Sequence, residues 1–244
     1  MNFIKEKLQI RHLGDSALIV QISNGISQAI HQKVISLVNM IEKNPFHGFI
    51  EAVPSYNNVT IHYDPVTVML NYHNELGQNA FEIVSTLINR YVEQFDDQFQ
   101  LDKRVVEVPV IYGEKYGPDL EYVASYNNLT PKQVIELHTK NEYLVHMIGF
   151  SPGFPYLGGM DKKLATPRKE SPRLSIPAGS VGIAGEQTGI YSFESPGGWQ
   201  IIGQTPMELF TPEKNPPTLI RPGDIVQFVP ITEDEFEKYK ENHR

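Results

Sequence analysis

One short run of the chain has the residue types and spacing of a serine nucleophile. Gly149-Phe150-Ser151-Pro152-Gly153 matches the G-x-S-x-G pattern. In hydrolases with this pattern, the serine lies in a strand–turn–helix, and the backbone N–H of the next residue stabilises the oxyanion. Here the next residue is Pro152, which has no N–H, and the following PGFPYLGG does not favour a helix. The run therefore predicts a structural turn rather than a serine nucleophile.

Three glycines at a spacing of three residues, Gly179, Gly182 and Gly185, are the best candidates for a backbone that approaches a phosphate. Their spacing matches neither the Walker A loop nor the Rossmann fingerprint. Turn glycines are the favoured interpretation, although a ligand could still approach this backbone closely.

The histidines do not indicate a metal site. The eight of them have no H-x-H or H-E-x-x-H spacing, and the chain has no cysteine. His138 falls near the end of a predicted short helix, where a histidine favours the helix dipole. His146 alternates with apolar neighbours on a predicted strand and is interpreted as a packed or surface histidine.

Binding chemistry is more evident than catalytic chemistry. Leu174–Pro206 has only two charged residues and combines aromatic side chains with backbone amides and a few polar groups. Small-molecule pockets and protein interfaces share this mixture, but ordinary barrel core explains any single residue equally well. Arg168 and Arg173 each adjoin a proline and could bind a carboxylate bidentately or be exposed loop charges. No set of residues can be assembled into a general acid/base pair.

Glycine and proline are concentrated around these candidates. Residues 149–206 hold 18 of the chain's 36 glycines and prolines, interleaved with large apolar residues. Because so many apolar side chains can be buried and offset the entropy of ordering, the segment predicts a rigid, turn-rich β surface rather than disorder.

The first part of the chain predicts a small α+β domain of order ββαββα, with its helices on one face of a mixed sheet. Alternation and turn residues predict strands at Leu8–His12, Ala17–Ile22, Phe49–Val53 and Asn58–Tyr63. Helical spacing predicts one helix over Ile26–Ile41 and a second with Leu76, Ala80, Ile83, Leu87, Tyr91 and Phe95 on one face. The polar stretch Gln94–Arg104 suggests a boundary, giving domains 1–98 and 99–244.

The second part is predicted to be mostly β, with closed-barrel or sandwich character. Val105–Tyr112 and Tyr143–Ile148 read as strands, and short strands and turns continue to Phe228–Pro230. Gly117-Pro118 predicts a helix start, Thr130–Gln133 fits a capping box, and the charged tail 233–244 predicts a solvated helix or a frayed end.

Composition excludes several classes of function. The net charge is −8, the pI is near 5.5 and no basic run exceeds two residues, which argues against nucleic-acid binding. The N-terminus lacks the apolar region of a signal peptide, and no apolar run approaches the length of a membrane span. We therefore expect a cytoplasmic, soluble protein.

Five motifs resemble one protein family across nearly the whole chain. They are GDSALIV (14–20), VPVIYGEKYGPDLEYVA (108–124), MIGFSPGFPYLGGMD (147–161), IPAGSVGIAGEQTGIYSFESPGGWQIIG (176–203) and RPGDIVQFVP (221–230). The family is called allophanate hydrolase subunit 1, and also kinase A inhibitor and 5-oxoprolinase B subunit. The resemblance implies a small α/β N-terminal domain followed by a cyclophilin-like β-barrel.

The resemblance also implies partners. Members pair with a homologous subunit 2, and with a third subunit of another family the pair forms a 5-oxoprolinase that uses ATP to open 5-oxoproline to glutamate. An ATP site on this chain is not evident. Alternatives are inhibition of a sporulation-type histidine kinase and a subunit 1 like that of allophanate hydrolase or urea carboxylase. A peptidyl-prolyl isomerase rests on fold analogy alone.

By resemblance, the segments 150–156, 177–188 and 195–199 face a site or interface shared with a partner. No catalytic or metal-binding residue is assigned. The candidate binding residues are Phe150, Pro152, Phe154, Tyr156, Arg168, Pro177, Gly179, Ser180, Gly182, Gln187, Thr188, Tyr191, Ser195, Pro196, Gly197 and Trp199.

Overall fold

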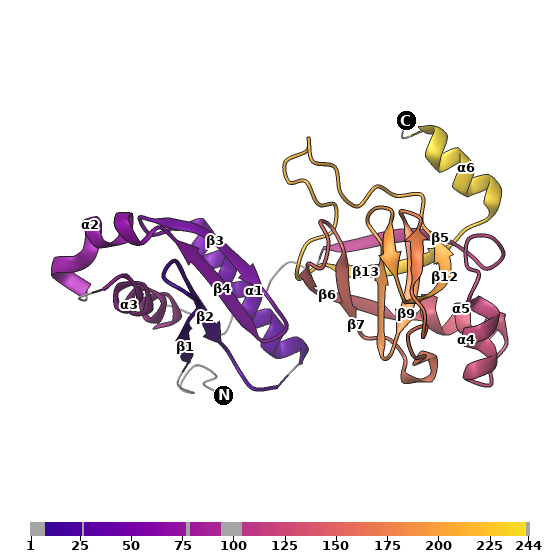
Figure 1. The fold of residues 1–244 in the computed structure, drawn as a ribbon, viewed down its shortest axis with the longest axis horizontal. Helices are drawn as coiled ribbons and strands as arrows, with labels where there is room; N and C mark the ends of the chain where they lie inside the picture. Colours follow the sequence, from indigo (N-terminus) through magenta and orange to yellow (C-terminus); the bar gives the residue numbers. More distant parts are fainter. Residues whose placement is uncertain (1–7, 26, 77–78, 94–103, 243–244) are drawn as a thin grey trace. The chain divides into compact units, whose positions relative to one another are not determined.

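The structure, a computed structural model, describes residues 8–25, 27–76, 79–93 and 104–242 (Figure 1). The chain divides into two compact units, Met1–Asp102 and Lys103–Arg244. The boundary predicted between residues 98 and 99 lies outside the described residues. Among the helices described, none has the length and apolar character needed to cross a membrane.

The first unit contains a four-stranded sheet whose order is β1-β2-β4-β3. Its strands are β1 (Gln9–His12), β2 (Ala17–Gln21), β3 (Phe49–Pro54) and β4 (Asn58–Tyr63). Leu18, Val20, Val59, Ile61 and Tyr63 are buried, as expected when alternate side chains face one core. The prediction of a mixed sheet is wrong, because every strand pair in it is antiparallel. A hairpin joins β3 to β4, and β4 rather than β3 lies beside β2.

Among the described residues, three helices share the core of this unit. They are α1 (Gln28–Lys43), α2 (Pro65–Leu76) and α3 (Ala80–Glu93). Helix α1 lies against β3 and β4. The Ser27 hydroxyl caps α1 by accepting from the Ile30 N–H at 3.2 Å, and Val34, Leu37 and Ile41 join the core beneath it.

The second predicted helix is two helices in the structure. Leu76 ends α2 and Ala80 begins α3, whereas predicted positions Ile26 and Phe95 lie outside the described residues. Sequence periodicity missed α2 because apolar residues, Val66 and Leu70, also occupy its exposed side, so the sequence shows no single apolar stripe.

The second unit is a closed seven-stranded barrel of order β10-β7-β6-β13-β5-β12-β9. Strands β13 and β5 are parallel and the other pairs are antiparallel. The strands are β5 (Val105–Tyr112), β6 (Glu142–Ile148), β7 (Pro155–Gly158), β9 (Ser180–Ala184), β10 (Gln187–Ile190), β12 (Gln200–Gln204) and β13 (Ile225–Pro230). The predicted fold class, an α+β unit followed by a mostly β barrel, is confirmed.

Short helices and a ribbon complete the barrel unit. They are α4 (Leu120–Tyr126), α5 (Pro131–Lys140), the 3-10 turn η1 (Lys162–Leu164), α6 (Glu233–Asn242) and the ribbon of β8 (Arg173–Ile176) with β11 (Ser195–Gly197). In Figure 1, α4 and α5 lie side by side at the edge of the barrel. The capping box at Thr130 and the C-terminal helix are confirmed. The helix expected at Gly117-Pro118 begins instead at Leu120, after a turn.

His138 lies in the core of the barrel unit. Its Nε2 is 2.9 Å from the Thr188 hydroxyl, which itself donates to the Gly182 carbonyl, so the proton is on Nε2. Its Nδ1 then accepts from the Tyr112 hydroxyl at 2.9 Å, and the ring stacks on Phe228. Burial lowers the pKa of His138 to about 3. The helix-dipole interpretation is therefore wrong, because the ring is neutral. His146 is packed rather than on the surface.

We expect this histidine to make stability depend on pH. The unfolded state, with a pKa of 6.5, takes up a proton that the folded state excludes down to about pH 3, so the free energy of unfolding falls as pH drops below 6.5. Between about pH 6 and about pH 4.5 the wild type should lose about 2 kcal/mol more than His138→Gln. Urea unfolding at each pH measures the difference. Equal pH slopes for the two proteins would contradict the buried neutral histidine.

Candidate functional site

A cavity of about 480 Å³ lies beside the barrel wall, within the glycine- and proline-rich segment. Its volume is in the range of small-molecule sites. It is lined by Phe150, Phe154, Tyr156, Arg168, Lys169, Pro172, Tyr191, Pro196, Gly197, Gly198 and Trp199. These residues come from β7 and the turn before it, the loop before β8, and the segments around β11, so the barrel brings distant parts of the sequence together.

An aromatic cluster forms the apolar wall of the cavity. Phe154 is at its centre and meets Phe150, Tyr156, Tyr191 and Trp199 edge to face, with ring centroids 5.2–5.6 Å apart. This geometry is favourable for aromatic rings. Trp199 and Phe154 are also buried members of a hydrophobic cluster outside the main barrel core. The wall is therefore supported by packing from behind, and it presents a preformed apolar surface.

Phe150 has an unusual backbone at the edge of this wall. Its φ is +65°, and its side chain is 72% exposed. A left-handed conformation costs a non-glycine residue about 1 kcal/mol, and it persists where the surroundings impose it. Here the Ser151 N–H donates to the Gly149 carbonyl at 2.7 Å, and the Phe154 N–H donates to the Ser151 carbonyl at 3.1 Å. Strand β7 follows rather than a helix, so the structural-turn prediction for this motif is confirmed.

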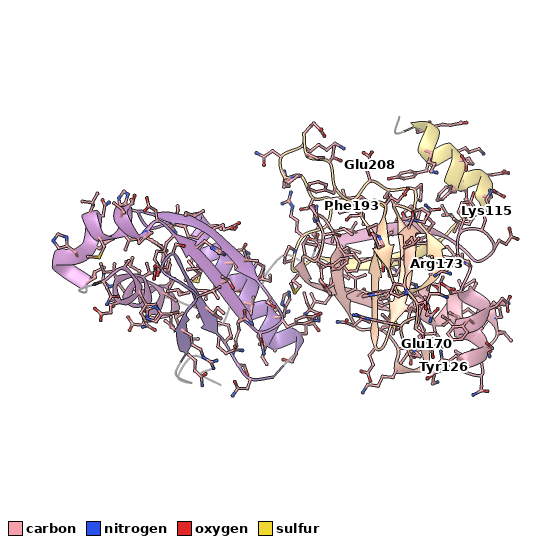
Figure 2. The ribbon with its side chains drawn as sticks, in the orientation of Figure 1. Lys115, Tyr126, Glu170, Arg173, Phe193 and Glu208 are labelled. Atoms are coloured by element: carbon pink, nitrogen blue, oxygen red, sulfur yellow. The ribbon has the colours of Figure 1, made fainter. Side chains whose placement is uncertain are left out.

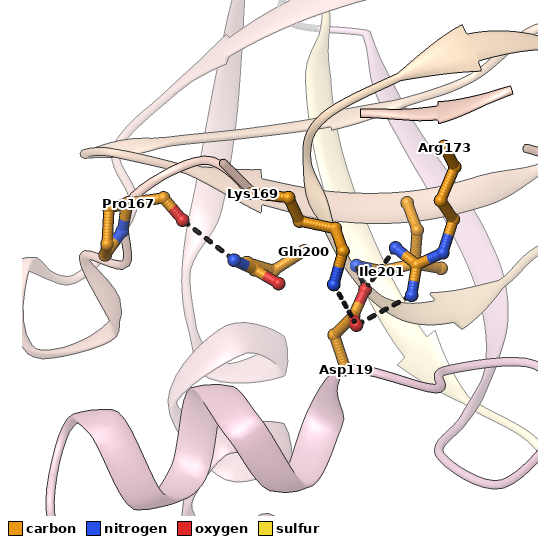
Figure 3. Close-up of polar contacts among 6 residues, drawn as sticks. All are labelled: Asp119, Pro167, Lys169, Arg173, Gln200 and Ile201. Carbon is orange, nitrogen blue, oxygen red and sulfur yellow. Dashed lines mark hydrogen bonds and ion pairs between the residues drawn. The ribbon is translucent and has the colours of Figure 1, made fainter. Parts of the chain in front are cut away.

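The loop between η1 and β8 carries the cations of the cavity. Three contacts hold this loop against the barrel. The side chain of Gln200 donates to the Pro167 carbonyl at 2.9 Å (Figure 3), and the Lys169 N–H donates to the Gly198 carbonyl at 2.7 Å. The Gly185 N–H donates to the Thr166 carbonyl, also at 2.7 Å. The backbone of Arg168 and Lys169 is therefore held in place beside the cavity.

Asp119 is a buried carboxylate beneath this loop, and sequence reasoning missed it. It is 5% exposed and accepts two hydrogen bonds from Arg173, at 2.7 and 2.8 Å. It also accepts from Lys169 at 3.2 Å and from the Ile201 N–H at 2.7 Å (Figure 3). Burial raises the pKa of Asp119, but these hydrogen bonds, led by those of Arg173, outweigh burial and lower it.

Of the two roles predicted for Arg173, the structure shows bidentate binding of a carboxylate, but that carboxylate belongs to the chain itself. Figure 2 labels Arg173, which begins β8 in the barrel unit. The bond joins the start of α4 to β8, so Arg173 serves to hold the fold together. A carboxylate placed 54 residues earlier in the sequence leaves no local pattern that would have revealed this pair.

The structure brings together only part of the candidate set. Phe150, Phe154, Tyr156, Arg168, Tyr191, Pro196, Gly197 and Trp199 line the large cavity. Pro177 and Ser180 line a second cavity of about 60 Å³, with Arg173. The rest lie outside both: Pro152, Gly179, Gly182, Gln187, Thr188 and Ser195. Sequence reasoning missed Lys169, Pro172 and Gly198, although each directly adjoins a candidate residue or a basic neighbour.

The three spaced glycines do not fit a nucleotide phosphate. The Gly179 N–H donates to the Tyr191 carbonyl and the Gly185 N–H to the Thr166 carbonyl, both at 2.7 Å. Gly182 lies within β9, between β10 and β12. Since these groups serve the barrel, they do not form the row of open donors that a phosphate requires. The turn interpretation is confirmed for Gly179 and Gly185, whereas Gly182 is a strand residue.

The cavity can bind and orient a ligand, and the side chains of its lining that could take part in acid–base or nucleophilic chemistry are Lys169, Tyr156 and Tyr191. Among the described residues its lining contains no carboxylate, imidazole or aliphatic hydroxyl. It offers aromatic faces, two cationic side chains and the backbone of Gly197 and Gly198. Within the described part of the chain, no group of three or more His, Asp or Glu side chains is placed to hold a metal ion.

Comparison with known families defines the class of protein. The model of the family described as "Carboxyltransferase domain, subdomain C and D" matches residues 8–220, and the chain belongs to this family. It is 48% identical over 235 residues to the 5-oxoprolinase B subunit of Bacillus subtilis, covering 96% of this chain and 98% of that protein. It is 41% identical to the 5-oxoprolinase B subunit of Escherichia coli O157:H7, covering 91% and 95%.

Solved structures agree with the fold. A conserved uncharacterized protein of Pyrococcus horikoshii, PH0987, is 46% identical with a TM-score of 0.54, covering 93% of this chain and all of that one. The protein TTHA0988 is 33% identical with a TM-score of 0.74 over 92% of this chain. This chain spans 40% of the length of TTHA0988.

Proposed function

We propose that this chain is the B subunit of an ATP-dependent 5-oxoprolinase and that it works only with partner subunits. The observation that carries the proposal is its 48% identity to a 5-oxoprolinase B subunit over nearly the full length of both proteins. The cavity supports it, since a lining of aromatic and cationic groups without a carboxylate or an imidazole among the described residues suits one part of a site that other subunits complete.

The chemistry of 5-oxoproline matches the cavity. The substrate is a five-membered lactam with one carboxylate, so it combines a flat apolar ring edge with an anion. The aromatic wall would pack against the ring and the cations on the loop would attract the carboxylate. Opening the lactam also requires water and acid–base groups. We assign these groups to a homologous subunit 2 and a third subunit. The spaced glycines offer no phosphate cradle. We therefore propose that the complex uses ATP, and we assign no ATP site to this chain.

Reconstitution tests the proposal. The chain is purified alone, with each partner and with both, and ATP-dependent release of glutamate from 5-oxoproline is measured. We expect release only from the complete mixture, and omission of this chain should reduce it to background. No release from any mixture, together with tight binding to a histidine kinase dimerisation domain, would overturn the proposal in favour of the kinase-inhibitor alternative. That alternative and the cytoplasmic location stay predictions.

A further inference from the structure

The positive charges around the cavity are not equivalent. Lys169 and Arg173 share the buried carboxylate of Asp119, which lies 3.2 Å from the Lys169 Nζ and 2.7 Å from an Arg173 nitrogen. The side chains of both cations are about 30% exposed. Their donors are directed to the protein itself, so a ligand would have to compete with Asp119 for them.

Arg168 is different from these two cations. Its side chain is exposed and lines the cavity, and among the described residues it makes no hydrogen bond or ion pair. Its charge reaches Tyr191: burial raises the pKa of the Tyr191 hydroxyl, and a hydrogen bond with the Trp199 backbone and the charges of Arg168 and Arg173 oppose that shift. The guanidinium of Arg168 lines the same cavity as the aromatic wall, and no described residue accepts from its five donors.

The backbone around Arg168 is held on both sides. The Pro167 carbonyl accepts from Gln200, and the Lys169 N–H donates to Gly198. Lys169 is further tied to Asp119 through its side chain. Because the loop is already ordered, a ligand that pairs with Arg168 has to restrict only one side chain, which favours binding.

We infer that the cavity is a carboxylate-binding site in which Arg168 pairs with the ligand's carboxylate and the aromatic wall receives its ring. Asp119 is a positioning residue, since it occupies the donors of Lys169 and Arg173 and leaves those of Arg168 to the ligand. This inference rests on the proposed function, which supplies 5-oxoproline as the ligand. To that function the inference adds Arg168 as the residue that selects an anionic ligand.

Trp199 provides a direct test on the chain alone, because it is the only tryptophan and it lines the cavity. Its fluorescence is followed during titration with 5-oxoproline and with 2-pyrrolidone, the same lactam without the carboxylate. We expect a saturable change with 5-oxoproline and an affinity lower by about tenfold or more for 2-pyrrolidone. Arg168→Gln should weaken 5-oxoproline binding by about tenfold or more and leave 2-pyrrolidone unaffected.

The neighbouring Lys169→Gln removes the same charge from the same cavity and should have a smaller effect, because Arg173 still pairs with Asp119. Absence of a saturable change with 5-oxoproline overturns the inference, as does equal binding of the two lactams. Equal effects of Arg168→Gln and Lys169→Gln also overturn it, since they would indicate a general electrostatic attraction.

The reconstituted complex separates this inference from the proposed function. With Arg168→Gln we expect KM for 5-oxoproline to rise by about tenfold or more with kcat little changed, and Arg221→Gln, an exposed arginine of the same unit, should match the wild type. An active complex with an unchanged KM in Arg168→Gln overturns the inference and leaves the function standing. An inactive wild-type complex, with the fluorescence results as expected, overturns the function and supports the carboxylate site.

Discussion

Replacing Gly179 with valine is expected to destabilise the barrel by more than about 4 kcal/mol and to abolish activity in the complex by loss of the fold. Gly179 has a φ of +81°, and a Cβ added there would lie 2.2 Å from the Thr205 carbonyl oxygen. That oxygen belongs to the backbone, so it cannot move aside as a side chain would. Gly179 also donates to Tyr191 and accepts from the Thr205 N–H at 2.9 Å, which fixes its position between two segments.

Gly185→Ala is the matched control for this prediction. Gly185 also has a positive φ, +59°, but an added Cβ would meet nothing within 4 Å. Its cost should be only the backbone strain, about 1 kcal/mol. Urea unfolding of the wild type and both variants measures the difference. A midpoint for Gly179→Val close to that of Gly185→Ala would show that the Thr205 contact does not constrain the turn.

Trp199→Ala is expected to remove measurable glutamate release from the reconstituted complex. Trp199 is 7% exposed and meets Phe154 and Tyr191 with ring centroids 5.5 and 6.4 Å away. Its truncation removes one wall of the cavity and the support of two others. Loss of a buried tryptophan side chain also costs about 3–5 kcal/mol of stability, so folding and assembly have to be measured beside activity.

Trp199→Phe separates the two effects. Phenylalanine keeps an aromatic edge-to-face contact with Phe154 and fills part of the volume, so this variant should assemble and retain a substantial part of the activity. Activity is compared only between complexes whose assembly has been verified by size-exclusion chromatography. A folded, assembled Trp199→Ala complex with full activity would show that the cavity lies outside the site.

Local patterns predicted most of the fold. Strands β4 and β5 follow the predicted ranges Asn58–Tyr63 and Val105–Tyr112, because alternation reflects one buried face. The capping box at Thr130 was equally evident, since its partners lie three residues apart. Helix α2 escaped prediction because the apolar side chains of Val66 and Leu70 lie on its exposed side, so its sequence has no single apolar stripe.

The candidate site was predicted less completely. The aromatic wall was found because Phe154, Tyr191 and Trp199 are large aromatic residues interleaved with the glycines and prolines of residues 149–206. Gly182 and Thr188 share that segment but serve the barrel: Thr188 is buried beside His138, and Gly182 lies in β9. Composition reports which segment is involved, whereas the direction of each side chain depends on strand register.

Chemistry within a few residues was sufficient to reject the serine nucleophile, because Pro152 lacks the N–H that such a site needs. It was also sufficient to identify residues 149–206 as a turn-rich β surface. The different roles of the three cations could be assigned only from the folded chain. Arg168, Lys169 and Arg173 look alike in sequence, and they differ only because Asp119 reaches two of them. That carboxylate is 54 residues from Arg173 and 82 from Ile201 along the chain, so only barrel closure brings these groups within hydrogen-bond distance.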